Sequence, residues 1–111
     1  MSTFQVETYV IRPEKQGEFT AWLQTVLKYK EKHPEVFEGL RSWKFFHREY
    51  GGISGSYVAM MEFGSMTDLD RVMTRMQQRV QEDEEFSKIN RAFEPLYDPA
   101  AYSCEIWSTV V

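Results

Sequence analysis

The feature that most constrains the fold of this chain is a repeated change in the spacing of its apolar residues. Residues 3–12 (TFQVETYVIR) alternate with a period of two, which predicts a strand. Between Glu14 and Lys32 the apolar residues recur at spacings of three and four, which predicts a helix that ends before Pro34. The chain then returns to an extended pattern, so we expect strands and helices to follow one another along its length.

The rest of the chain repeats this change in spacing. In order, the further predicted elements are a strand over 39–50, a glycine-rich turn over 51–55, a strand over 56–63, a helix over 66–80 capped by Ser65, an acidic break over 81–85, a shorter helical segment that Pro95 ends, and a strand over 101–111. The order strand, helix, strand, strand, helix, strand predicts an α+β fold. It is the ferredoxin-like βαββαβ arrangement, a four-stranded antiparallel sheet with two helices on one face.

The composition narrows the class of protein. With 111 residues, a net charge of −4 and 15% aromatic residues, we expect one domain over 1–111 with a dense aromatic core or an apolar interface. The sequence contains no basic stripe for nucleic acid, no apolar run long enough for a membrane span and no recognisable secretion signal. The single cysteine, Cys104, predicts a cytoplasmic protein without an internal disulfide, and we expect its thiol to be buried.

The predicted strands carry apolar residues on both faces. In the first strand, Val6 and Val10 lie on one face, and Tyr9 and Ile11 lie on the other. A sheet with one face in water alternates more strictly than this. The two helices cover one face, and the chain has no residues left to cover the second. We therefore predict a homodimer that packs sheet to sheet, and assembly beyond the dimer stays open.

Three carboxylates on the less apolar faces of these strands have two interpretations. They are Glu7, Glu62 and Glu105. Buried at a two-fold interface, they would need cationic partners. The candidates for that role on strand 39–50 are Arg41, Lys44, His47 and Arg48. Alternatively, the carboxylates lie at strand ends in water.

Four stretches of the sequence carry a resemblance in topology to known proteins: VIRPEKQGEFTAWL, GLRSWKFF, YVAMMEFGSMTDLDRVM and DEEFSKI. Together they resemble the dimeric α/β-barrel superfamily, which includes antibiotic-biosynthesis monooxygenases, NIPSNAP-like proteins and stress-responsive barrel proteins. The resemblance covers essentially the whole chain. It implies a barrel of two facing sheets and a small ligand in a cleft between the sheet and the helices of each subunit. The candidate substrate-binding residues are then Tyr9, Trp22, Tyr57 and Phe63.

The activities known in that superfamily can be compared with this chain position by position. Haem-degrading members use an Asn on the first strand, a Trp near the end of the third and a His on the second helix. The corresponding positions hold Glu7 and Phe63, and the predicted helix 66–80 contains no His. We therefore expect no haem degradation, and His33, His47 and Cys104 are too scattered to predict a metal site or a cofactor. The cofactor-independent quinone-forming monooxygenases have no strict motif to compare.

His47 is the candidate catalytic residue, and its role depends on the register of the hairpin. Histidine titrates near neutral pH, which suits a base acting on a phenol or an activated C–H group. If Tyr50 pairs with Tyr57, His47 faces the inside of the dimer barrel near Glu62 and has a structural role. If the register of the hairpin is shifted by one residue, the His47 side chain faces the cleft under the helices instead. We favour the first register because it places the aromatic and Met-rich face of strand 56–63 under the helices.

Two functions stay open at this point. The resemblance and the surplus of aromatic residues favour a cofactor-independent, monooxygenase-like enzyme acting on a small aromatic or polyketide-like molecule. The lack of a matched catalytic set favours a non-catalytic protein that binds a small ligand or serves in assembly. The sequence does not decide whether the protein is an enzyme.

Overall fold

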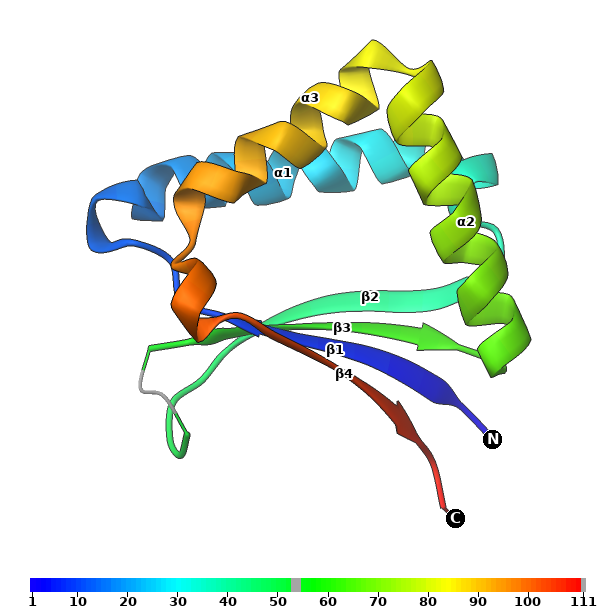
Figure 1. Cartoon of the computed structure of the whole chain (residues 1–111), viewed down its shortest axis with the longest axis horizontal. Helices are drawn as coiled ribbons and strands as arrows, with labels where there is room; N and C mark the ends of the chain where they lie inside the picture. The colour runs from blue at the N-terminus through cyan, green and yellow to red at the C-terminus, as the bar shows by residue number, and fades with distance from the viewer. Residues whose placement is uncertain (53–54, 111) are drawn as a thin grey trace.

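The computed structural model describes residues 1–52 and 55–110, and it contains the predicted elements in the predicted order (Figure 1). The strands are β1 (Thr3–Tyr9), β2 (Leu40–His47), β3 (Tyr57–Phe63) and β4 (Ser103–Ser108). The α-helices are α1 (Gln16–Lys32), α2 (Met66–Glu82) and α3 (Glu84–Phe93). The α+β class and the ferredoxin-like order of elements are therefore confirmed.

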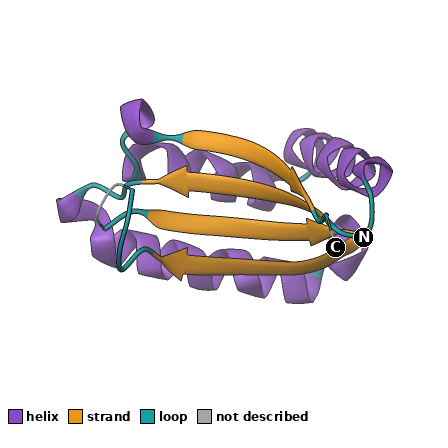
Figure 2. Cartoon of the chain, turned by 90° about the horizontal axis from the view of Figure 1, so that it is seen from below, coloured by secondary structure: helices purple, strands orange, loops and turns teal. Residues whose placement is uncertain are grey.

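The strands form one antiparallel sheet with the order β2-β3-β1-β4. β1 lies inside the sheet, where Val6 is opposite Met60 of β3 on one side and Glu105 of β4 on the other. Figure 2 shows the α-helices behind the sheet, so the face turned toward the viewer is not covered by any described helix. The described chain therefore has two layers, helices and sheet.

The starts of the later helices are fixed by side-chain caps. The Ser65 hydroxyl accepts a hydrogen bond from the backbone N–H of Asp68 at 3.2 Å, which starts α2 where the capping pattern predicts. Asp83, in the acidic break, accepts a hydrogen bond from the N–H of Glu85 at 3.0 Å and starts α3. In the described residues, none of the helices has the length and apolar character needed to cross a membrane.

The core fills the space between the helices and one face of the sheet. Alternate residues of β3 face the helices, and Phe63, which is 0% exposed, packs with Leu69 and Val72 of α2. Gly39 has φ +104, and a Cβ at this position would lie 3.3 Å from Val72 Cγ2. Glycine therefore suits both the left-handed backbone and the close approach of α2 at the start of β2.

The register of the β2–β3 hairpin corrects the favoured prediction. His47, not Tyr50, pairs with Tyr57, so the register is displaced by an odd number of residues and the other face of β2 lies under the helices. The prediction considered only the apolar face of β3. The observed register also buries much of Trp43 under the helices and leaves Lys44 exposed, which is the less costly arrangement for a charged side chain. Residues 53–54 of the predicted turn lie outside the described residues.

The last strand is more exposed than its sequence pattern predicts. β4 covers Ser103–Ser108 within the predicted strand 101–111, and Val111 lies outside the described residues. All its residues are exposed, including Cys104, whose predicted burial is therefore wrong. The reason is that β4 is an edge strand of the described sheet, where it pairs only with β1.

Candidate functional site

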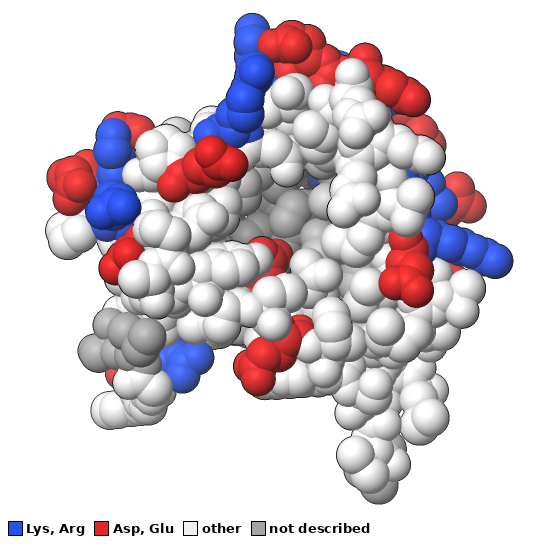
Figure 3. All heavy atoms as spheres, in the orientation of Figure 1, with Lys and Arg blue, Asp and Glu red and all other residues white. Residues whose placement is uncertain are grey.

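A cavity of about 150 Å³ lies between the helices and the helix-facing side of the sheet. Figure 3 shows the surface hollowed at this place, with acidic atoms at the lower edge of the hollow. An apolar cavity of about 150 Å³ in another protein holds one benzene molecule, so this space suits a single ring. The aromatic residues in its wall are Tyr9, Trp22, Trp43, Phe45, Phe86 and Phe93.

The aromatic wall is held in place by contacts from several elements. The indole Nε1 of Trp22 donates a hydrogen bond to the Ile89 carbonyl at 2.8 Å, which joins α1 to α3. The Trp22 ring lies 4.6 Å from the Phe93 ring, and the Trp43 and Phe45 rings lie 5.3 Å apart, measured between centroids. Rings fixed in this way offer flat apolar surfaces to a ligand at little cost in side-chain entropy.

Among the described residues of the cavity wall, two buried polar atoms have no hydrogen-bond partner. They are the Tyr9 hydroxyl and the Trp43 Nε1, and both are buried. Burial, and after it the nearby Glu7 carboxylate and Tyr57, raise the pKa of the Tyr9 phenol well above its ordinary value of 10. The Tyr9 hydroxyl therefore keeps its proton, and both groups are hydrogen-bond donors without an acceptor.

Glu7 adds a carboxylate to the same wall. It lies opposite Ala59 in β1 and so faces the helices, not the open face of the sheet. Its Oε2 accepts a hydrogen bond from the Tyr102 hydroxyl at 2.6 Å. Burial, and after it this bond to Glu7, raise the pKa of Tyr102 far above its ordinary value, so Tyr102 remains a neutral donor.

The structure brings together some of the predicted site residues and separates others. Tyr9 and Trp22 lie in the cavity wall. Tyr57 stacks on Tyr9 at a ring distance of 6.2 Å, but its hydroxyl points to Gln16 Oε1 at 3.0 Å. Phe63 packs against Leu69 and Val72 of α2 and does not belong to the cavity wall. The His47 side chain is 48% exposed and lies outside the cavity wall. Its ring packs against the Tyr57 ring, with 5.0 Å between the centroids.

Sequence reasoning missed Trp43 and Glu7 as residues of the cavity. The alternation of residues 41–47 places Trp43 and His47 on one strand face, so the signal for Trp43 was present once the register was known. Glu7 was predicted, with Glu62 and Glu105, to lie either at a two-fold interface or at a strand end in water. The structure keeps those two on the open face and turns Glu7 toward the helices.

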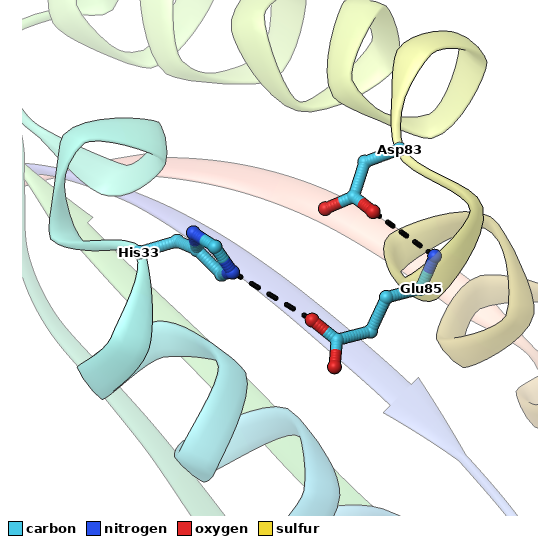
Figure 4. A group of neighbouring side chains, drawn as sticks. All are labelled: His33, Asp83 and Glu85. Carbon is cyan, nitrogen blue, oxygen red and sulfur yellow. Dashed lines mark hydrogen bonds and ion pairs between the residues drawn. The ribbon is translucent and has the colours of Figure 1, made fainter.

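A second group of titratable side chains lies where the helices meet (Figure 4). His33 Nε2 is 3.6 Å from Glu85 Oε1, and one ligand atom each of His33, Asp83 and Glu85 lies within 4.8 Å of the others, as a metal ion would need. The Arg79 guanidinium argues against a metal, because it donates to Asp83 Oδ2 at 3.1 Å and lies 3.2 Å from His33 Nδ1. A metal ion here would lie beside the positive charge of Arg79, so we assign this group the role of joining the helices.

Solved structures share this fold over nearly the whole chain. A NIPSNAP family protein from Agrobacterium tumefaciens matches with a TM-score of 0.65 and 16% identity, over 99% of this chain and 94% of its own. A structure described as an antibiotic biosynthesis monooxygenase matches with a TM-score of 0.60 and 14% identity, over 98% of this chain and 99% of its own. A dimeric protein of ferredoxin-like fold from Bacteroides fragilis matches with a TM-score of 0.58 and 10% identity, over 97% of this chain and 96% of its own.

No protein family model matches the sequence, and no curated protein matches it either. At identities this low, similarity between structures establishes a fold and leaves the activity open. The predicted resemblance is confirmed at that level. This chain has the ferredoxin-like fold found in NIPSNAP family proteins and in an antibiotic biosynthesis monooxygenase.

Proposed function

We propose that this protein is a homodimeric α/β-barrel protein that binds a small, single-ring aromatic molecule in the cavity between its sheet and its helices. The observation that carries the proposal is an aromatic wall that contains two buried donors without partners, the Tyr9 hydroxyl and Trp43 Nε1. Leaving a buried donor unsatisfied costs about 1–3 kcal/mol. An oxygen atom on a ligand ring would accept a hydrogen bond from these groups and remove part of that cost.

The size of the cavity favours one ring over a polyketide-like ligand. About 150 Å³ holds a benzene-sized group. Pockets for larger organic ligands commonly measure about 300–1,000 Å³. Methionines Met61, Met73 and Met76 also line the space and adapt to small differences in ring shape.

Binding of phenol and toluene tests this proposal, because the two rings are similar in size and only phenol carries an oxygen. We expect calorimetry to show tighter binding of phenol by about three- to tenfold, the contribution of one net hydrogen bond. The substitution Tyr9→Phe should reduce this preference. Tyr57→Phe is the matched control, since its hydroxyl is bonded to Gln16 outside the cavity wall. Failure of both rings to bind would contradict the proposal, whereas a co-purified aromatic molecule in native mass spectrometry would support it.

Cofactor-independent oxygenation of the bound ring is the second candidate function. It is supported by the likeness to a structure described as an antibiotic biosynthesis monooxygenase and by the Glu7 carboxylate in the wall, which can accept a proton from a phenol. Tyr9 keeps its proton and is a poor base. His47 lies one ring away from the wall, behind Tyr57, so its earlier role as the base is the weaker assignment.

Oxygen consumption with hydroquinone as the substrate separates the enzyme from the binding protein. If the protein is an oxygenase, we expect turnover to persist in His47→Ala and to fall by at least about 10²-fold in Glu7→Gln, the usual contribution of a general base. Loss of turnover in His47→Ala alone would restore His47 as the base. Binding without oxygen consumption would leave the protein as a non-catalytic ligand-binding protein.

The homodimer is supported by the open face of the sheet. Large apolar side chains remain exposed there, including Phe46 at 46% and Trp107 at 48%. Exposed apolar surface of this kind marks an interaction site. The structure from Bacteroides fragilis that shares the fold is described as dimeric.

A further inference from the structure

We propose that the occupant of the cavity is a small aromatic amine, whose ammonium group is held by the Glu7 carboxylate. The inference rests on the proposed binding function and adds the charge of the ligand to it. Three observations carry it: the charges of the cavity wall, the missing counter-charge of Glu7 and the aromatic faces around the space.

In the part of the cavity wall that the structure describes, one side chain is charged. Among the described residues that line it, Glu7 is the only acidic one, and none is Lys, Arg or His. An anionic ligand would meet repulsion from Glu7 and find no cation to bind it. A neutral ligand would leave the carboxylate without a counter-charge, whereas an ammonium group would supply one.

Glu7 has no cationic partner in the part of the chain that the structure describes. Its hydrogen bond comes from the neutral Tyr102 hydroxyl, and the ion pairs found among the described residues involve other acids. The side chain is partly withdrawn from water. Carboxylates in such positions are normally paired, because withdrawal from water disfavours an isolated charge. Tyr102 occupies one carboxylate oxygen, Oε2, which leaves Oε1 for a ligand.

The aromatic wall favours the same class of ligand. The faces of Trp and Phe rings attract cations, and aromatic cages recognise ammonium groups in this way. Trp22 and Trp43 both belong to the wall. An aromatic amine that also carries a ring oxygen would bring an ammonium for Glu7 and an acceptor for the donors of the same wall, Tyr9 and Trp43.

Three probes of similar size and different charge test the inference. They are 3-hydroxybenzylamine, 3-hydroxybenzyl alcohol and 3-hydroxybenzoate, and all carry the same ring oxygen. With the wild-type protein at pH 7, we expect calorimetry to show that the amine binds about tenfold more tightly than the alcohol, since hydrogen bonds to charged groups are the stronger ones. The benzoate should bind most weakly.

The substitution Glu7→Gln should abolish the preference for the amine while the alcohol still binds. Glu31→Gln makes the same change of charge on the exposed surface of α1 and should leave the preference unchanged. Equal binding of the amine and the alcohol to the wild type, for example because a partner subunit neutralises Glu7, would overturn the inference and leave the proposed function intact. If none of the three rings binds although phenol does, the inference fails and the proposed function stands; if phenol does not bind either, both fail. The probe series on the wild type decides the matter even if Glu7→Gln does not fold.

Discussion

The most informative single residue is Tyr9. Its buried hydroxyl can donate a hydrogen bond to a ligand, but it lowers the stability of the ligand-free protein because it has no partner among the described residues. Tyr9 is 2% exposed, and its hydroxyl has no hydrogen-bond partner. Removing an unsatisfied polar group from the interior relieves a desolvation cost. We predict that Tyr9→Phe raises the free energy of unfolding of the ligand-free protein by about 1 kcal/mol, measured by urea denaturation at fixed protein concentration. Tyr57→Phe, which removes a bonded hydroxyl, should give no such gain. A loss of stability in Tyr9→Phe would show that the hydroxyl has a partner.

Asp83 is one residue that makes stability depend on acid. The hydrogen bond from Tyr29 at 2.6 Å, followed by the Glu85 N–H and the charges of Arg79 and His33, lowers the pKa of Asp83 below 3.8. Because the folded state holds the charged form more tightly, the stabilisation is complete above pH 3.8 and is lost as the pH falls through the lower folded-state pKa.

We therefore predict that Asp83→Asn lowers the Tm at pH 7, and that the difference from the wild type shrinks below pH 3.8. Asn remains a good N-cap, so the difference reports the charge and not the cap. Thermal melts between pH 3 and pH 7 measure it. A Tm difference that stays constant down to pH 3 would show that the effect of the substitution does not come from the charge of Asp83.

At the scale of elements, the start of α2 depends on one hydroxyl. Ser65 caps this helix through its bond to the N–H of Asp68. We predict that Ser65→Ala lowers the free energy of unfolding by about 1 kcal/mol, the usual loss for an N-cap serine. Thr67→Ala, one residue inside the helix and exposed, is the control and should change stability much less. Denaturant unfolding compares the two, and equal losses would show that the cap contributes little.

The elements were predictable from the sequence, but their pairing was not. Periodicity within a segment reports which residues share a face, so it gave the strands, the helices and the common face of Trp43 and His47. The register between β2 and β3 depends on a turn that periodicity does not describe, and on an irregularity between Leu40 and Ser42. A displacement by an odd number of residues exchanges the two faces. Tyr9 and Trp22 do not depend on that register, so the sequence could name them as candidates, whereas placing Trp43 in the cavity wall required the structure.

At the scale of the whole molecule, the sheet separates two surfaces with different roles. The helix-facing side contains the cavity, and the open side carries exposed apolar residues. Glu62 on the open side already has partners within the chain, the Ser2 hydroxyl at 2.7 Å and the Ser42 hydroxyl at 3.2 Å. The bond from Ser2 first, and then the bond from Ser42 and the charges of Arg41 and Lys44, lower the pKa of Glu62. A carboxylate satisfied in this way can enter an interface at less cost than an unpaired one.

We predict that the wild-type protein sediments with twice the 13.2 kDa mass of the chain at micromolar concentration, and that Met60→Glu dissociates it. Met60 pairs with Val6 at the middle of the open face, so the substitution would place like charges on both sides of a two-fold interface. Met66→Glu is the matched control, because Met66 is exposed and belongs to α2, not to the open face of the sheet. Analytical ultracentrifugation of the three proteins measures the mass. A wild-type monomer, or a Met60→Glu dimer, would contradict sheet-to-sheet packing. Because the cavity is built within one chain, a folded Met60→Glu monomer should still bind phenol, which separates the assembly from the ligand site.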